Sequence, residues 1–229
     1  IDRMRFKMTA ESPAGQFWNV LVARSQEIYK AMPEADRDAG MGLLVDRLAA
    51  TERYERAYSV AGQIENIPLS RWKTIEVMRH ENRYADMAKA CEDLEKLDNK
   101  ELSARALRTR ADLYKDQLAR YEDAIKLYNE INDAPATSWA IVECYEKDGK
   151  PDRAVAMCSE IEGFFVDIAP VACYRKVEIW ERAGDKTKAI AAARATMKKY
   201  PKHQVSSTAH QMLERHGIAT GGGVTDAEE

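Results

Sequence analysis

A motif of twelve residues occurs five times along this chain, with a sequence that varies from copy to copy. The copies read RYERAYSVAGQI from Arg53, RYADMAKACEDL from Arg83, RYEDAIKLYNEI from Arg120, KPDRAVAMCSEI from Lys150 and DKTKAIAAARAT from Asp185. Their fifth residues are Ala57, Met87, Ala124, Ala154 and Ala189, at intervals of 30, 37, 30 and 35 residues. A period in this range is typical of supersecondary units that stack, because no single unit can bury its apolar face alone. The sequence therefore predicts an array of repeats.

The repeats are expected to be pairs of helices, A and then B, because apolar residues recur at helical spacing and the alternation typical of strands is scarce. We predict an all-α, right-handed solenoid of antiparallel helix pairs. Its five pairs are expected over residues 34–67, 69–98, 101–134, 136–166 and 168–201. The predicted domain bounds are 1–33 for N-terminal flanking helices, 34–201 for the repeats, 202–217 for a closing helix and 218–229 for a disordered tail.

The composition limits the classes of partner. The 229 residues are 45% hydrophobic and 32% charged, which suffices for one continuous repeat array. The 35 basic and 38 acidic residues nearly cancel, so we expect no nucleic-acid partner. No apolar run approaches the roughly 18 residues that a membrane-spanning helix needs, so no membrane insertion is expected.

The beginning of the chain predicts a helix with an upstream neighbour. Ile1, Met4 and Met8 fall on one helix face, and no apolar leader precedes them. We therefore expect a fragment or processed chain in which residues 1–11 pack on a neighbouring segment or fray. The compartment stays open: the cytoplasm is slightly favoured, and a periplasmic or exported protein is not excluded.

The cysteines favour a reducing compartment. None forms a C-x-x-C pair, and all four fall within apolar helical stretches. We predict that they are unpaired, buried thiols rather than a disulfide framework. They are Cys91, Cys144, Cys158 and Cys173.

The fifth unit carries the sequence features of a known family. Trp180 lies nine residues before Ala189, and Pro201 lies twelve residues after it. These residues resemble the large helix A residue, the small helix B residue and the closing proline of the tetratricopeptide repeat family. Unit four has the same nine-residue step from Tyr145 to Ala154. The resemblance implies a helical-repeat fold over about residues 34–201 and a role in binding proteins.

The other units depart from the family pattern in defined ways. Unit three has ten residues from Tyr114 to Ala124, so we predict one inserted residue in its turn. Val142 and Val177 replace the glycine usual in helix A, which should splay the helix pair. The family's clamp for a C-terminal carboxylate needs Lys and Asn where this chain has Trp72, Glu76, Trp139 and Glu143, so that clamp is absent.

The small residues have a steric reason. A small residue at the crossing point lets the axes of helices A and B approach within about 8–10 Å. Ala57, Ala124, Ala154 and Ala189 supply it. The large residues of helix A are expected to fill the space opposite; they are Leu48, Met78, Tyr114, Tyr145 and Trp180.

No catalytic constellation is visible at motif spacing. The glycines around Met41 follow no strand, and no His pair has the i, i+4 spacing of a metal-binding helix. We therefore predict no enzymatic activity, no metal and no cofactor.

The predicted concave face repeats two residue types. Six residues before each large helix A residue stand Gly42, Trp72, Arg108, Trp139 and Tyr174. Two residues before it stand Asp46, Glu76, Asp112, Glu143 and Glu178. Positions four apart share one helix face, so these residues would form an acidic ladder beside an aromatic stripe. We predict a groove for a partner segment that is amphipathic or rich in Lys and Arg.

Unit three interrupts the negative field of this ladder. Arg105, Arg108 and Lys115 lie on the same predicted face and could take an acidic partner residue. The predicted partner-binding residues are Trp72, Glu76, Arg105, Arg108, Asp112, Lys115, Trp139, Glu143, Tyr174 and Glu178.

Two other interpretations stay open. The acids could simply lie on solvated helix faces, and the tryptophans could belong to the core. The chain could also be a structural building block that associates with itself or stacks end to end on other helical repeats. Phe17 and Trp18 in the N-terminal helix favour that second interpretation.

Overall fold

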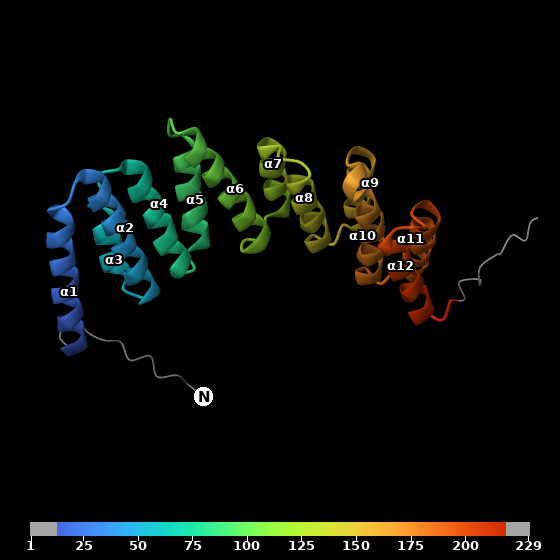
Figure 1. Ribbon diagram of the computed structural model, residues 1–229, viewed down its shortest axis with the longest axis horizontal. Coiled ribbons are helices and arrows are strands. Elements are labelled where there is room, and N and C mark those ends of the chain that lie inside the picture. Colours follow the sequence, from blue (N-terminus) through green and yellow to red (C-terminus); the bar gives the residue numbers. More distant parts are fainter. Residues whose placement is uncertain (1–12, 219–229) are drawn as a thin grey trace, which may run out of the picture. The chain divides into compact units, whose positions relative to one another are not determined.

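The computed structural model describes residues 13–218, so the predictions for residues 1–11 and for the tail after residue 218 lie outside the described residues. The chain divides into two compact units, with the boundary after Arg110, and each is described by itself. Between residues 13 and 218 the structure contains helices and no strand, which confirms the predicted all-α fold (Figure 1).

The first unit is built from antiparallel neighbours. Its helices are α1 (Pro13–Lys30), α2 (Glu34–Ala50), α3 (Tyr54–Ala61), α4 (Ile67–His80), α5 (Tyr84–Glu95) and the first part of α6 (Lys100–Asp116). The side chain of Asn66 accepts a hydrogen bond from the backbone N–H of Leu69, which caps the start of α4. Buried residues of α1, α2 and α3 form one apolar core with Val77 of α4.

The second unit starts with the end of α6 and contains the best-defined repeats. Its other helices are α7 (Tyr121–Ile131), α8 (Ala136–Lys147), α9 (Pro151–Phe164), the short 3-10 helix η1 (Val166–Ile168), α10 (Ala169–Arg182), α11 (Lys186–Lys199) and α12 (Gln204–Arg215). Asp185 caps the start of α11 by accepting a hydrogen bond from the backbone N–H of Lys188. Two core clusters fill this unit, one on α8, α9 and α10 and one on α10, α11 and α12.

The turn from helix A to helix B has the same backbone conformation in every repeat. Five residues before each aligned residue, one residue takes a positive φ. These residues are Glu52, Asn82, Ala119, Gly149 and Gly184, with φ of 59°, 59°, 51°, 68° and 77°. The left-handed conformation ends helix A and aims the chain into helix B. The repeat in the sequence therefore corresponds to a repeated turn.

A backbone hydrogen bond closes each of these turns. The N–H of Lys150 donates to the carbonyl of Tyr145 at 2.9 Å, and that of Asp185 to the carbonyl of Trp180 at 3.0 Å. In the third helix pair, the N–H of Arg120 donates to the carbonyl of Tyr114, which lies six residues earlier instead of five. The predicted inserted residue therefore lies in this turn.

The five aligned residues lie where helices cross. Ala57, Met87, Ala124 and Ala154 are 0% exposed, and Ala189 is 1% exposed. All four cysteines are also buried, as predicted. Burial raises the pKa of the Cys91 and Cys158 thiols to about 12, so neither is a reactive thiolate near neutral pH.

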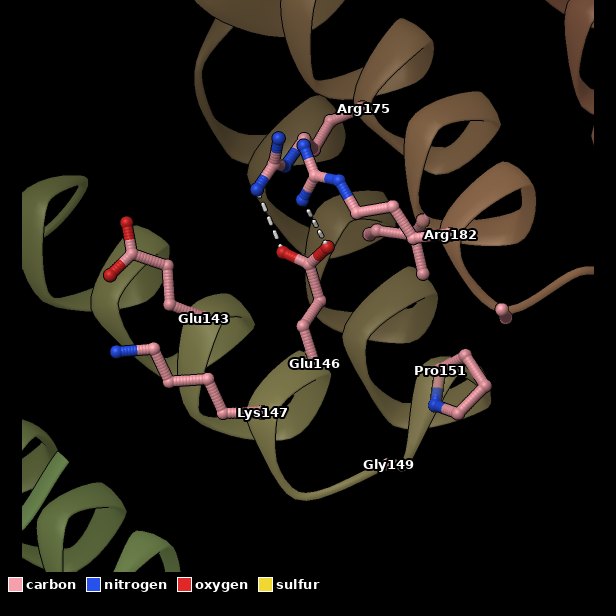
Figure 2. Close-up of a pocket in the computed structure, with 9 residues that line it drawn as sticks. Glu143, Glu146, Lys147, Gly149, Pro151, Arg175 and Arg182 are labelled. Atoms are coloured by element: carbon pink, nitrogen blue, oxygen red, sulfur yellow. Dashed lines mark hydrogen bonds and ion pairs between the residues drawn. The ribbon is translucent and has the colours of Figure 1, made fainter. Parts of the chain in front are cut away.

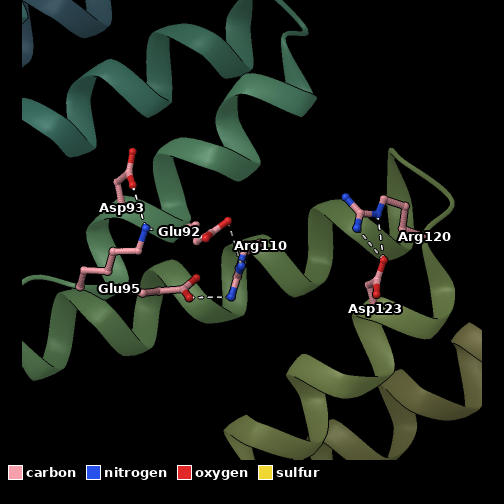
Figure 3. A network of polar contacts seen from close by, with 7 residues as sticks. Glu92, Asp93, Glu95, Arg110, Arg120 and Asp123 are labelled. Atoms are coloured by element: carbon pink, nitrogen blue, oxygen red, sulfur yellow. Dashed lines mark hydrogen bonds and ion pairs between the residues drawn. The ribbon is translucent and has the colours of Figure 1, made fainter.

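Ion pairs add to the packing within each unit. In the first unit, the Arg110 guanidinium contacts Glu95 at 2.6 Å and Glu92 at 3.6 Å, which ties the end of α5 to α6 (Figure 3). In the second unit, Arg120 contacts Asp123 at 2.7 Å across the first turn of α7 (Figure 3).

Candidate interaction surface

In the first unit, the predicted stripe begins with a buried aromatic ring. Trp72 is only 5% exposed, and the guanidinium of Arg105 lies over its ring at 3.9 Å from the ring centre. Its indole Nε1–H donates to Glu76 at 2.9 Å. The interpretation of Trp72 as a core side chain therefore gains support, and we expect Trp72→Ala to lower the stability by about 3 kcal/mol. A partner would meet Arg105, which is exposed, before the indole.

The acids of the first unit are held by a lysine that the sequence analysis did not single out. Lys73 contacts Asp46 at 2.7 Å and Glu76 at 2.8 Å, which joins α2 to α4. Burial raises the pKa of Glu76, but the charge and hydrogen bonds of Lys73 and Trp72 outweigh it and hold that pKa below its usual value. Arg108 is half-buried on α6.

In the second unit, α6 contributes Asp112 and Lys115. The hydroxyl of Tyr128 donates to Asp112 at 2.6 Å, and burial together with this bond raises the pKa of Tyr128. Lys115 contacts Glu143 on α8 at 2.6 Å. Burial lowers the pKa of Lys115, but its pairing with Glu143 raises it above the usual value, so this lysine stays charged.

The aromatic residues of the second unit are accessible. Trp139 on α8 and Tyr174 on α10 are half-buried, with part of each ring against the core clusters. Glu143 follows Trp139 by four residues, and Glu178 follows Tyr174 by four, so each acid lies one turn beyond its aromatic residue. The side chains of Glu143 and Glu178 are 48% and 36% exposed. In this unit, the predicted stripe and ladder are therefore open to a partner.

A pocket of about 790 Å³ lies where these faces of α8 and α10 end (Figure 2). Both walls carry charges. The walls and the α8–α9 turn contribute Glu143, Glu146, Lys147, Gly149, Pro151, Arg175, Ile179, Arg182 and Ala183. Lys147 lies one helical turn beyond Glu143, and Arg182 lies one turn beyond Glu178. Both Lys147 and Arg182 line the pocket.

Glu146 connects the two walls. It contacts the guanidinium of Arg175 at 2.7 Å and that of Arg182 at 2.7 Å (Figure 2). Arg175 also contacts Glu178 at 2.6 Å. The pocket is thus polar and close to charge balance, with Ile179 and Ala183 between the ionic groups.

The partners of the acids were the main feature that the sequence analysis missed. Lys73 and Arg175 lie three residues before Glu76 and Glu178, a spacing that could have indicated both pairs. Contacts between helices, such as Glu146 with Arg175, depend on the register of α8 against α10. The ladder is therefore a set of paired carboxylates, several of which remain accessible.

Within residues 13–218, no group of three or more His, Cys, Asp or Glu side chains is arranged to hold a metal ion. None of the helices described is both long and apolar enough to cross a bilayer.

Residues 173–203, which include most of α10 and all of α11, match the sequence model of the tetratricopeptide repeat (TPR). The chain contains a tetratricopeptide repeat. The match falls on the fifth helix pair, where Trp180, Ala189 and Pro201 carry the resemblance. TPR repeats generally serve as scaffolds for protein interactions. No curated protein sequence matches the chain.

Solved structures of TPR-like repeats align with most of this chain. A point variant of nearly identical TPR-like repeats, from a Podosopora anserina protein assigned as a kinesin light chain, aligns with a TM-score of 0.50 and 12% identity. The alignment covers 75% of this chain and 100% of that chain. The same repeats without that substitution align with a TM-score of 0.49 and 12% identity, over 76% and 100% of the two chains. YrrB, described as a TPR protein with an unusual peptide-binding site, aligns with a TM-score of 0.44 and 13% identity, over 75% and 91%.

Proposed function

We propose that this chain is a non-enzymatic scaffold that holds a segment of a partner protein against the α8 and α10 faces of its second unit. The observation that carries the proposal is the pocket of about 790 Å³ between α8 and α10, which Glu143 lines and beside which Trp139, Tyr174 and Glu178 lie on the same two helices. A pocket of this size is within the range of known binding sites, and its charged walls favour a partner segment with charged side chains.

The chemistry of the two faces indicates an amphipathic partner segment. Trp139 and Tyr174 each expose part of a ring, and such rings take apolar side chains or the face of a guanidinium. Glu143 and Glu178 are accessible carboxylates beside them. Their internal partners leave room for one more cation, because an ionised carboxylate has about four acceptor positions. We therefore expect a segment that combines apolar side chains with Lys or Arg.

Selection from a display library of random peptides on the intact chain tests this function. The selected peptides should combine apolar residues with Lys or Arg. The affinity of the best peptide, measured by fluorescence anisotropy, should fall about thirtyfold for Trp139→Ala combined with Tyr174→Ala, as for hot-spot aromatics. Tyr121→Ala on α7 is the matched control and should leave the affinity unchanged.

The charges and the aromatic rings should have different effects. Glu143→Gln keeps an oxygen for Lys115 and removes one charge, so it should mainly slow association and reduce its salt dependence. Because Trp139 packs partly on the core, the melting temperature of every variant should be measured as a stability control. If Trp139→Ala unfolds the protein, Tyr174→Ala alone provides the test. If the affinity of the selected peptides does not change on substitution of Trp139, Glu143 or Tyr174, this surface is not the binding site.

The alternative function, a building block that associates with itself, concerns a different surface, which lies on α1.

A further inference from the structure

Helix α1 has two apolar faces, and only one of them is covered. Val22 is 7% exposed and belongs to the first unit's core, against which Tyr29 also packs. The outward side carries the residues that we call the α1 stripe: Phe17, Val20, Leu21 and Ile28, with exposures of 65%, 69%, 40% and 49%. Their spacing of three, four and seven residues places them on one helix face. An outermost helix with one contact needs only one apolar face, so the stripe indicates a second contact.

Helix α12, the last described helix of the second unit, has a polar outer side. The exposed residues of α12 are all polar: Gln204, Ser207, Gln211, Glu214 and Arg215. A helical repeat array needs such a polar outer face to be soluble at its end. The α1 stripe departs from that pattern, because its four apolar residues are exposed beside only Arg24 and, at its edge, Glu27.

We propose that the α1 stripe is a homodimer surface, on which α1 of a second copy packs antiparallel about a twofold axis. Two of the exposed apolar positions, Leu21 and Ile28, are placed symmetrically about a point between Arg24 and Ser25. Leu21 and Ile28 each lie about 5 Å along the helix from that point, and Phe17 lies about 11 Å from it, toward the start of the helix. In an antiparallel pair, Leu21 therefore faces Ile28 of the second copy, and Phe17 lies near the end of the second α1, which Met32, 40% exposed, follows.

The charges of α1 fit the same arrangement. Arg24 and Glu27 are 74% and 67% exposed and contact each other at 3.0 Å. Across the proposed twofold axis, Arg24 lies about 3 Å along the helix from Glu27 of the second copy, no further than from its own Glu27. The two copies can therefore form a closed network of two arginines and two glutamates at the centre. A surface that is complementary to itself in this way is the hallmark of an isologous interface.

The size of the surface indicates a weak dimer. A helix of 18 residues is about 27 Å long, and one helix pair buries less than the roughly 1,200 Å² of a standard interface. We expect dissociation in the micromolar range or above. This dimer is independent of the proposed groove on α8 and α10, because the residues of the two surfaces do not overlap.

Sedimentation velocity from low micromolar to near-millimolar concentration tests the dimer. The wild-type chain should shift from monomer to dimer over this range. Leu21→Glu combined with Ile28→Glu places like charges opposite each other and should weaken the association at least tenfold. Val171→Glu on α10 is the matched control, because Val171 is 49% exposed like Ile28, and it should leave the association unchanged.

Cross-linking tests the orientation. All four native thiols are buried, so a new cysteine on α1 would be the accessible one. A mixture of Leu21→Cys and Ile28→Cys chains should give mainly mixed disulfides. Equal residues should cross-link poorly, because they lie about 10 Å apart along the antiparallel pair, beyond disulfide reach.

Three results would overturn the proposal. The first is a wild-type chain that stays monomeric at every concentration tested. The second is a dimer that tolerates the double Glu variant. The third is efficient cross-linking of Leu21→Cys to itself, which would indicate parallel helices.

Discussion

At the scale of single residues, the turn positions show how the repeat is encoded. Gly149 and Gly184 adopt the left-handed conformation without a Cβ, whereas Glu52, Asn82 and Ala119 adopt it with one. For residues other than glycine this conformation costs about 1–2 kcal/mol. The early turns therefore store backbone strain that the later turns avoid.

Replacing Ala119 by glycine should stabilise the protein. The residue has φ of 51°, and glycine relieves the strain at the cost of a more flexible unfolded chain. We expect a net gain of roughly 0.5–1 kcal/mol in the free energy of unfolding by urea. Ala183→Gly is the control, because Ala183 has a helical φ of −72° and should lose stability with the same replacement. Equal losses in the two variants would contradict the strain.

Glu162 on α9 should give the second unit an acid-sensitive contribution to stability. Its side chain is 7% exposed and contacts Lys176 at 2.6 Å, Lys199 at 2.5 Å and Tyr200 at 2.9 Å. Burial raises its pKa, but these hydrogen bonds lower it from 4.5 to about 2. The unfolded chain then binds a proton below about pH 4.5 that the folded chain does not, so this stability is present above that pH and is lost as the pH falls toward 2.

Glu162→Gln should therefore cost roughly 2 kcal/mol at neutral pH, because it leaves the largely buried Lys176 without its counter-charge. The difference between the wild type and the variant in urea unfolding should shrink as the pH falls below 4.5. Glu160→Gln, an exposed neighbour on the same helix, should change little. A difference that does not depend on pH would show that the carboxylate charge does not contribute.

The residues that the sequence predicted best are those with a steric role. The aligned residues, from Ala57 to Ala189, are buried at every position, because a repeat fixes where helices cross. The predicted partner-binding residues were harder to interpret, because Trp72 and Trp139 occupy equivalent positions but differ in burial. The difference arises from Arg105, which covers Trp72 and belongs to the following helix pair. One sequence does not reveal such a contact.

At the scale of elements, the pairs of helices were predictable and their ion pairs were not. Turn signals such as Gly149 followed by Pro151 end one helix and start the next, and they are visible in the sequence. The contact of Lys73 with Asp46 depends on how α4 lies against α2, which local patterns do not specify. The acidic ladder was therefore found as a pattern without its counter-charges.

The close contact of α1 with α2 makes Gly40 a sensitive position. A Cβ on Gly40 would lie 2.5 Å from two ring carbons of Tyr29, too close for the helices to stay in place. Gly40→Ala should therefore loosen α1, and amide hydrogen exchange over residues 13–30 should accelerate at least tenfold. Gly163→Ala on α9 is the control: nothing lies within 4 Å of its new Cβ, so helix propensity should make it neutral or stabilising by up to about 1 kcal/mol. Unchanged exchange in α1 would show that Tyr29 simply moves aside.

At the scale of the whole molecule, the division into two units predicts how stability is distributed. In a repeat array, each unit contacts mainly its neighbours, so a local loss of stability need not spread along the chain. The buried thiols report on this separately, because Cys91 lies in the first unit and Cys144, Cys158 and Cys173 lie in the second. Each thiol should react only when its surroundings open.

Thiol labelling with mass-spectrometric readout can therefore separate the units. In sub-denaturing urea, Glu162→Gln should speed the labelling of Cys158 and Cys173 about tenfold or more, since a tenfold change corresponds to about 1.4 kcal/mol. Cys91 should keep its wild-type rate, because Glu162 contacts only α10, α11 and the residue that follows α11. Gly40→Ala is the reciprocal variant and should speed the labelling of Cys91 more than that of Cys158. Acceleration of all four thiols by one common factor would instead show that the whole chain opens as a single cooperative body.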